Sequence, residues 1–137
     1  MDTKLPLSRG RLYHRTPDWV RSGEIFHVRV RVARTMGRWL TEAGLAEALI
    51  DSVTHYHVGR RWRCRLFVVM PDHVHGLLAF AREPGMSATI QQWKAYHARQ
   101  HGVRWQTGYF DHRIRNDSEF VEKAHYLRRN PVAKGLC

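Results

Sequence analysis

The chain has 137 residues, which suits one domain over residues 1–137 and leaves no room for two independent cores. Its 43% of hydrophobic and 26% of charged residues favour a folded domain over a disordered one. The longest apolar runs, such as residues 66–70, are too short to cross a bilayer, and the N-terminus lacks the apolar segment of a secretory signal. Two cysteines, Cys64 and Cys137, exclude a disulfide scaffold and a four-cysteine zinc site. We therefore expect a cytoplasmic protein.

Positive charge dominates the sequence but is unevenly distributed. Twenty-three lysines and arginines against twelve aspartates and glutamates give a formal net charge of +11 at pH 7. Residues 1–39 and 54–115 are strongly basic, whereas residues 40–53 carry acidic side chains and neither lysine nor arginine. This balance favours a polyanionic partner, because cations that neutralise phosphates release condensed counterions. The alternative is a solvated basic surface with no specific ligand.

The first half of the chain predicts a strand and a helix after an irregular segment over residues 1–22. Residues 24–33 alternate, which predicts a half-buried strand with a basic outer face. Its apolar set is Phe26, Val28, Val30 and Val32, and its basic set is His27, Arg29 and Arg31. Apolar residues then recur at helical spacing over 40–56, so we expect a helix that opens near Thr41. The apolar stripe of that helix is Leu45, Ala48, Leu49 and Val53.

The second half predicts a hairpin, two helices and one more strand. Residues 62–70 and 73–80 have strand-like patterns on either side of Pro71 and Asp72. A helix is expected over 87–100 with Ser87 as its N-cap, followed by a short strand over 108–114. The last helix, over about 117–129, would be capped by Asn116 with Glu119 and would stop before Asn130 and Pro131. This order predicts an α+β, ferredoxin-like antiparallel sheet with helices on one face, followed by a C-terminal helix.

A pair of histidines is the sharpest chemical feature. His73 and His75 are two apart on a predicted strand, so both imidazoles project from one face. Two neutral imidazoles side by side supply two of the three ligands of a metal site, although ordinary histidines remain the alternative. His55 and His57 form a second such pair, but it lies at a predicted helix end, where residues two apart do not face each other. We expect that second pair to be a surface or core feature.

Tyr126 lies near the end of the last predicted helix. It is four residues before Asn130, so the two share a face if the last turn reaches that far. A tyrosine can act as a covalent nucleophile, and a nearby cation would activate it. Sequence spacing alone does not choose among Tyr126 and the other tyrosines, which are Tyr13, Tyr56, Tyr96 and Tyr109.

Several segments, in their order along the chain, carry a resemblance to a known family. They are VVMPDHVHGLLAF, WKAYHAR, WQTGYFDHRIRND and HYLRRNPVAKGL, preceded by the strand HVRVRV. Together they resemble the REP-associated tyrosine transposases, which belong to the His-hydrophobic-His family of single-strand DNA nucleases with one catalytic tyrosine. The resemblance covers roughly residues 24–136.

This resemblance implies a function and a set of site residues. His73 and His75 would bind a divalent ion, Mg²⁺ or Mn²⁺, with Asn130 as the third ligand by position, and Tyr126 would be the nucleophile. The protein would cut and join single-stranded DNA at hairpin-associated sites through a 5′-phosphotyrosine. It would act as a monomer or homodimer, associated with the bacterial nucleoid. The expected DNA contacts are Arg29, Arg31, Lys94, Arg113 and Arg115.

Two other readings stay open at this point. A non-catalytic nucleic-acid-binding module derived from such a transposase would have the same basic and aromatic composition. A two-histidine phosphodiesterase would need two His-x-Thr/Ser motifs on strands, and only His14, Arg15 and Thr16 fit that pattern. Formation of a metal-dependent phosphotyrosine on an oligonucleotide separates the enzyme from the binding module.

Overall fold

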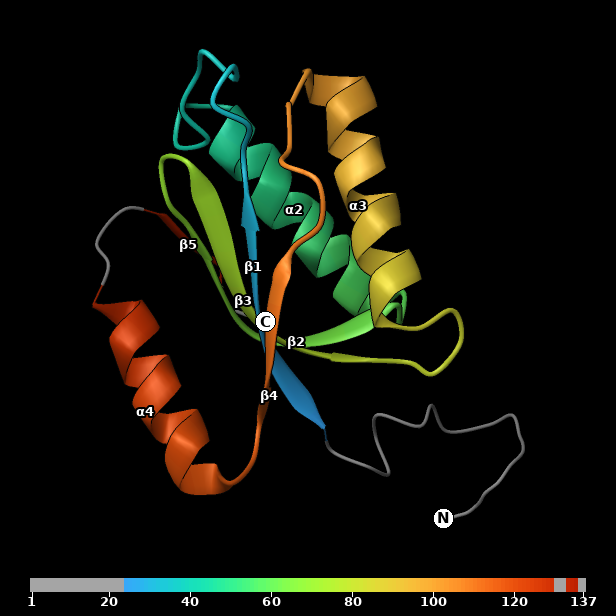
Figure 1. Ribbon diagram of the computed structural model, residues 1–137, viewed down its shortest axis with the longest axis vertical. Coiled ribbons are helices and arrows are strands. Elements are labelled where there is room, and N and C mark those ends of the chain that lie inside the picture. The colour runs from blue at the N-terminus through green and yellow to red at the C-terminus, as the bar shows by residue number, and fades with distance from the viewer. Residues whose placement is uncertain (1–23, 130–132, 136–137) are drawn as a thin grey trace.

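The computed structural model describes residues 24–129 and 133–135, so the irregular segment expected over 1–22 lies outside the described residues. Figure 1 shows the elements, coloured along the chain. They are β1 (Ile25–Arg31), α2 (Leu45–Val58), β2 (Trp62–Val69), β3 (His73–Phe80), α3 (Met86–His101), β4 (Phe110–Ile114), α4 (Asp117–Arg128) and β5 (Ala133–Gly135). The order of strands and helices expected up to α4 is confirmed, and the short β5 is an addition that the sequence pattern did not predict.

The strands form one antiparallel sheet in the order β4-β1-β3-β2-β5. The βαββαβ succession with β1 and β3 at the centre confirms the ferredoxin-like prediction. The hairpin between β2 and β3 turns at Pro71 and Asp72, where the Met70 N–H donates to the His73 carbonyl at 2.8 Å. β3 therefore begins with His73 in the middle of the sheet.

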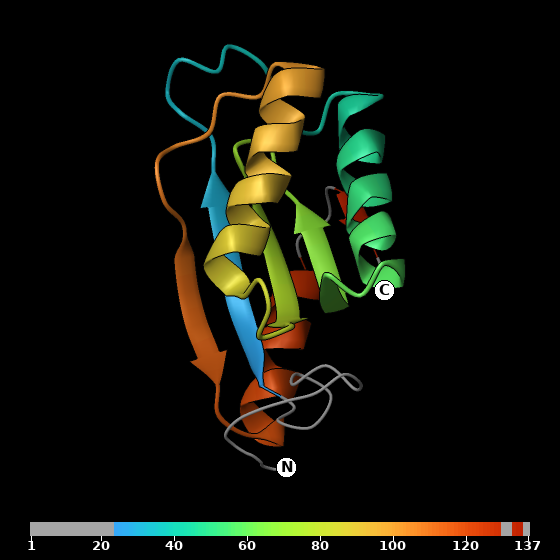
Figure 2. The same cartoon turned by 90° about the vertical axis from the view of Figure 1, so that its right-hand side faces the viewer.

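Helices cover both faces of the sheet. In Figure 2, α2 and α3 lie in front of the sheet and α4 lies behind it. The first face packs Val28, Val30 and Trp62 with Leu49 and Trp93 in the larger core. The second face packs a smaller cluster against α4, formed by Leu66, Val68, Leu77, Ala124 and Leu127. α2 and α3 thus share one face, as expected, and the C-terminal helix occupies the other.

A register shift between Cys64 and Leu66 explains how β2 serves both layers. Trp62 and Cys64 face the larger core, but after the shift Leu66 faces α4 and Phe67 faces the larger core. One extra residue in a strand exchanges the faces of the residues that follow it. The unbroken apolar run in this strand is therefore buried on both sides.

Two expected helix starts are wrong. α2 begins at Leu45 rather than near Thr41, because Gly44 before it has a φ of 89°, a left-handed conformation that is not helical. Ala46, and not Ala48, completes its buried stripe. α3 begins at Met86 after Gly85, whose φ is 95°, so Ser87 lies inside the helix and is not its N-cap.

α4 begins as the sequence predicts. The Asn116 side chain accepts a hydrogen bond from the Glu119 N–H at 2.9 Å. The Glu119 carboxylate accepts from the Arg115 N–H at 2.7 Å and contacts His112 Nε2 on β4 at 2.6 Å. The helix ends at Arg128, before Asn130 and Pro131. Its first turn is therefore fixed to the edge of the sheet.

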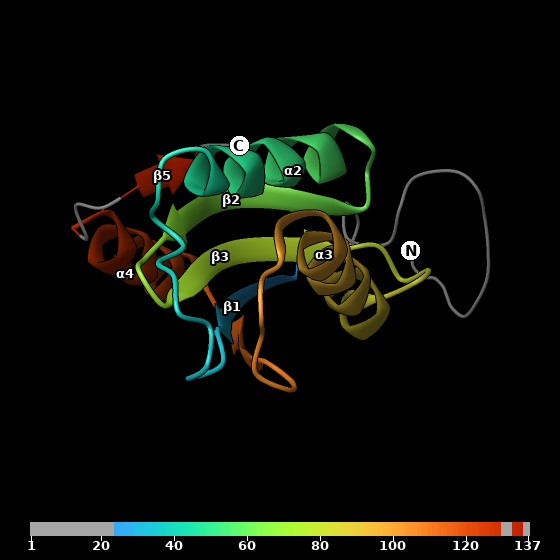
Figure 3. The same ribbon diagram turned by 90° about the horizontal axis from the view of Figure 1, so that it is seen from above.

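The segment between β1 and α2 crosses the end of the sheet (Figure 3). Its Val32 N–H donates to the Asp72 carbonyl at 2.9 Å, and its Leu40 N–H donates to the Pro71 carbonyl at 2.8 Å. Leu40 is also fully buried. The crossing segment is thus held against the turn that precedes His73. Within the part of the chain that the structure describes, no helix has the length and apolarity of a bilayer span.

Candidate active site

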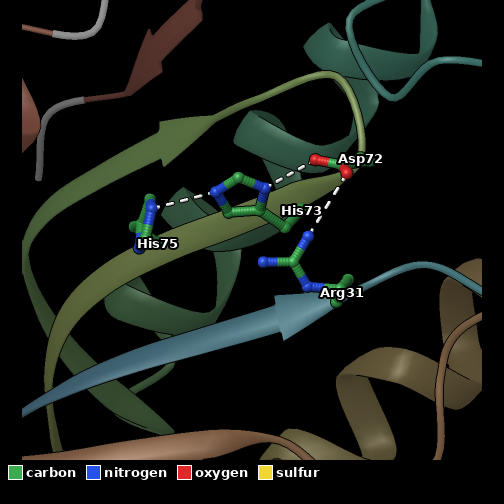
Figure 4. Close-up of polar contacts among 4 residues, drawn as sticks. All are labelled: Arg31, Asp72, His73 and His75. Atoms are coloured by element: carbon green, nitrogen blue, oxygen red, sulfur yellow. Dashed lines mark hydrogen bonds and ion pairs between the residues drawn. The ribbon is translucent and has the colours of Figure 1, made fainter.

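His73 and His75 project from β3 on the side of the sheet that α4 covers. Val74 between them points into the larger core, as the alternation of a strand requires. The two Nε2 atoms lie 3.0 Å apart, with the rings nearly perpendicular (Figure 4). The two Nε2 atoms therefore lie at hydrogen-bonding distance from each other.

Asp72 fixes the orientation of His73. Asp72 Oδ1 lies 2.7 Å from His73 Nδ1, and its Oδ2 accepts from the Arg31 guanidinium at 3.2 Å (Figure 4). The hydrogen bond from His73, with the positive charge of Arg31 nearby, lowers the pKa of Asp72. Since the ionised carboxylate only accepts, Nδ1 of His73 carries the hydrogen and Nε2 offers its lone pair. This is the nitrogen that faces His75.

His27 on β1 extends the chain of imidazoles. Its Nε2 lies 3.0 Å from Nδ1 of His75, and the two rings stack with centroids 5.1 Å apart. His27 is buried, and its own Nδ1 has no hydrogen-bond partner. The alternation along this strand predicts that His27 lies on the basic face with Arg29 and Arg31, but it gives His27 no role. The alternation also does not predict which residues of β3 lie opposite His27.

Burial keeps the inner two imidazoles neutral. It lowers the pKa of His75 to about 3, and electrostatic interactions with the neighbouring histidines and the strand arginines act in the same direction. Burial likewise lowers the pKa of His27 to about 4, with Lys123 of α4 as the next contributor. Neutral imidazoles keep the lone pairs that a metal ligand needs.

The separation of the two Nε2 atoms is that of a direct hydrogen bond, and it also equals the separation of two ligands on one divalent ion. Two nitrogens bound about 2.1 Å from one ion at a right angle lie about 3.0 Å apart. The observed separation of the Nε2 atoms has this value. Among residues 24–129 and 133–135, no group of three or more histidine, cysteine, aspartate or glutamate side chains could hold a metal. Asn130, the expected third ligand, lies outside the described residues.

α4 lies beside the histidines. Its Ala124 and Leu127 pack on Val68 and Leu77. Val68 is the partner of His75 on β2, and Leu77 follows His75 by two positions on β3. Tyr126 is next to Leu127 and is 59% exposed, and no described residue hydrogen-bonds its hydroxyl. The structure thus places the tyrosine's helix on the histidine face and leaves the hydroxyl accessible.

The expected arginine contacts separate into two groups. Arg29 and Arg31 share the histidine face, and the Arg29 guanidinium lies 4.6 Å from the centre of the Phe110 ring. Arg113 stands opposite Phe26, on the face of α2 and α3, and pairs with Glu24 at 3.3 Å. Arg115 follows β4 and is exposed, 3.8 Å from Glu119. The structure therefore brings Arg29 and Arg31 to the site but not Arg113.

Lys94 requires a correction. We expected this lysine to contact DNA, but only 6% of its surface is exposed. Its ammonium group donates to the carbonyls of Gln106 and Gly108, both at 2.8 Å. Lys94 instead fixes the segment between α3 and β4, because a buried ammonium group needs acceptors. Sequence composition carries no signal of this kind of burial.

The second histidine pair has the structural role that we expected. His57 Nδ1 accepts a hydrogen bond from the Cys64 N–H at 3.0 Å, which joins the end of α2 to β2. Tyr56 between the two histidines is buried in the larger core, and His55 is exposed. The two histidines of this pair therefore lie in different environments.

These features define a ferredoxin-like domain with a convergent histidine pair on a central strand and a helix over the same face. Comparison with solved structures finds this fold in a REP-associated tyrosine transposase bound to a REP hairpin. The two share 20% sequence identity with a TM-score of 0.67, over 91% of this chain and 73% of that one. No protein-family model and no curated protein matches the chain. The α+β fold expected from the order of strands and helices is thereby confirmed.

Proposed function

We propose that the protein is a metal-dependent endonuclease and strand transferase that acts on single-stranded DNA at hairpin-associated sites. The observation that carries this proposal is the convergence of His73 and His75 on the face of the sheet that α4 covers. The similarity in fold to a transposase bound to a DNA hairpin supports the same class of substrate. The strong positive charge of the chain fits a polyanion.

His73 and His75, with Asn130, would hold the divalent ion, which we assign as Mg²⁺ or Mn²⁺. Bound there, the ion would polarise the non-bridging oxygens of the scissile phosphate. Asp72 and Arg31 would hold His73 in the tautomer that offers its Nε2 lone pair. When the Nε2 lone pair of His75 binds the ion, Nδ1 of His75 carries the hydrogen. His27 Nε2 would accept a hydrogen bond from that Nδ1.

Tyr126 would be the nucleophile. Its hydroxyl oxygen forms a bond to phosphorus in line with the leaving 3′ oxygen, and the bond from phosphorus to that oxygen breaks. The phenolic proton passes to water, and the leaving oxygen takes up a proton to become a 3′-hydroxyl. The product is a 5′-phosphotyrosine on α4. Attack by a 3′-hydroxyl from another strand reverses the step and joins that strand without an external energy source.

The test is a covalent adduct assay with short single-stranded hairpin oligonucleotides and Mn²⁺. The wild-type protein should give a nucleotide-linked peptide that contains Tyr126, identified by mass spectrometry. Tyr126→Phe should give no adduct and should bind DNA as the wild type does, because only the hydroxyl is removed. Tyr96→Phe is the matched control, since Tyr96 is also exposed but lies on α3, on the other side of the sheet.

Two results would contradict this function. An adduct that persists in Tyr126→Phe would assign the nucleophile elsewhere. DNA binding without any adduct in the wild type, at every hairpin and metal concentration tried, would favour the non-catalytic binding module instead.

A further inference from the structure

A cleft of about 680 Å³ opens at the end of the sheet where β1 ends and β3 begins. It lies between the segment that follows β1 and the Asp72 turn. Its polar and aromatic lining consists of Arg31, Arg34, Arg38, Trp39, Glu42, Asp72 and Gln106. Only Arg31 and Asp72 also belong to the hydrogen-bond chain of the histidines, so most of the cleft lies outside that site.

Trp39 is the aromatic wall of the cleft. It is 62% exposed, whereas Trp62 and Trp93 are buried in the larger core. Its backbone is held in place, because Leu40 beside it is fully buried and the Leu40 N–H donates to the Pro71 carbonyl. An exposed indole is suited to stacking on a nucleic-acid base, since every base presents a flat π-face.

The arginines give the cleft its charge. Arg31 pairs with Asp72, and Arg38 pairs with Glu42 at 3.3 Å and donates to the His101 carbonyl at 2.9 Å. Arg34 is exposed and has no hydrogen bond or ion pair with any residue of the described part of the chain. Its guanidinium is therefore available for a phosphate, for which its planar donor fork is suited.

The cleft adjoins the histidine site directly. Arg31 and Asp72 line the cleft, and the same two residues form the hydrogen-bond chain that ends on His73 (Figure 4). A DNA strand with its scissile phosphate at His73 and His75 can therefore reach the mouth of this cleft on one side.

We propose that the cleft is a binding site for a nucleotide of the single DNA strand that flanks the scissile phosphate. The base of that nucleotide stacks on Trp39, and its phosphate pairs with Arg34. The occupant is single-stranded because a base inside a duplex does not expose its face for stacking. This inference rests on the proposed function for the identity of the polymer, but its binding step needs neither metal nor Tyr126.

The experiment measures DNA binding without cleavage. Fluorescence anisotropy follows a labelled single-stranded oligonucleotide with the full chain in EDTA, and the binding is repeated with oligonucleotides that carry one abasic position each. One abasic position should weaken binding by about tenfold in the wild type, as expected for loss of one base stack. Trp39→Ala should weaken binding to the intact oligonucleotide by about the same factor. The affinity of this variant should not fall further when the oligonucleotide carries that abasic position.

Two further variants separate stacking from charge. Trp39→Phe should retain most of the affinity, because it keeps a ring for stacking. Arg34→Gln should reduce the slope of log affinity against log salt by about 0.7, as expected for one lost phosphate contact on a single strand. Arg60→Gln is the matched control; this exposed arginine precedes β2 at the opposite end of the sheet, and its loss should leave the sensitivity to the abasic position unchanged.

Three outcomes would overturn the inference. The first is a Trp39→Ala variant that has a normal thermal unfolding midpoint and binds single-stranded DNA as tightly as the wild type does. The second is an equal loss of affinity for blunt duplex DNA, and the third is a wild-type dimer that Trp39→Ala dissociates, which would make the cleft a contact between copies. If the wild type forms an adduct and DNA binding does not depend on Trp39, only the proposal for the cleft is contradicted. If no adduct forms and DNA binding does depend on Trp39, only the catalytic proposal is contradicted.

Discussion

The hydrogen-bond chain through Asp72, His73, His75 and His27 gives each imidazole a defined role. Asp72 accepts from His73, so the lone pair of His73 Nε2 points to the place where His75 also points. His27 contacts the far nitrogen of His75 and is itself buried. Outer contacts of this kind fix the tautomer and the orientation of a ligand, and therefore influence the affinity for metal.

Removing one imidazole of the pair should remove the metal. In His73→Ala, the affinity for Mn²⁺ measured by calorimetry should fall by at least about a hundredfold, and cleavage should be lost. His55→Ala is the control, because His55 belongs to the other His-x-His pair and is exposed at the end of α2. Unchanged Mn²⁺ binding in His73→Ala would show that His73 is not a ligand.

The contribution of His27 can be measured in the same way. His27→Phe keeps a ring of similar size but removes the nitrogen that contacts His75, so Mn²⁺ affinity should fall by about ten- to a hundredfold. His27→Gln retains an acceptor and should lose less. Equal Mn²⁺ affinity in wild type and His27→Phe, with a normal unfolding transition, would refute a positioning role for His27.

The two helices on opposite faces depend on different local interactions. α4 is fixed at its first turn by the Asn116 cap and by the contact of Glu119 with His112, and further along by Ala124 and Leu127. α3 is fixed along its length by Trp93 and His97, which meet Ser52 of α2. The position of Tyr126 therefore depends on few contacts, and that of α3 depends on a buried network.

Loss of the α4 cap should affect the position of Tyr126. Asn116→Ala should lower the free energy of unfolding in urea by about 1 kcal/mol. It should also slow adduct formation more than it weakens DNA binding, since it loosens the helix that carries the proposed nucleophile. Asn116→Ser keeps a capping oxygen and should restore both. A cap variant with an unchanged adduct rate would show that α4 is held by its apolar contacts alone.

His97 should make the stability depend on pH. Ser52 Oγ donates to the Leu49 carbonyl, so His97 Nε2 must donate to Ser52, which leaves the buried Nδ1 without a partner. Burial, with the charge of His101, lowers the pKa of His97 to about 4, whereas an unfolded histidine titrates near 6.5. The unfolded chain therefore binds the extra proton between these values, and stability should fall as the pH drops from 6.5 towards 4.

The measurement is urea unfolding at a series of pH values. The part of the slope due to His97 should be about 1 kcal/mol per pH unit below pH 6. His97→Gln keeps a donor to Ser52 but does not titrate, so its stability should change less with pH. Parallel pH profiles for wild type and His97→Gln would show that His97 is not held neutral in the fold.

The whole molecule combines a strongly basic sequence with an asymmetric placement of its charges. Arg29 and Arg31 share the histidine face, and Arg31 and Arg34 line the cleft next to it. Arg113 lies on the opposite face, and Lys94 is buried. Only part of the net charge of +11 can therefore interact with a DNA strand bound at the site.

Salt dependence of DNA binding should report this asymmetry. Arg29→Gln should reduce the slope of log affinity against log salt by about 0.7 for a single strand. Arg113→Gln removes the same charge from the other face and should leave the slope unchanged. Equal effects of the two substitutions would indicate that the DNA also contacts the α2 and α3 side or the sheet edge.

Local patterns in the chain were enough to predict the ferredoxin-like order of elements, the hairpin before His73 and the common face of His73 and His75. These follow from alternation, helical spacing and turn residues, all of which act between near neighbours. The tertiary structure alone decided that His27 meets His75 across two strands, that Lys94 is buried and that Arg113 faces away. It also brings Trp39 into one cleft with Arg31 and Asp72. Strand register and burial bring together residues far apart in the chain, and no local pattern encodes which of them will touch.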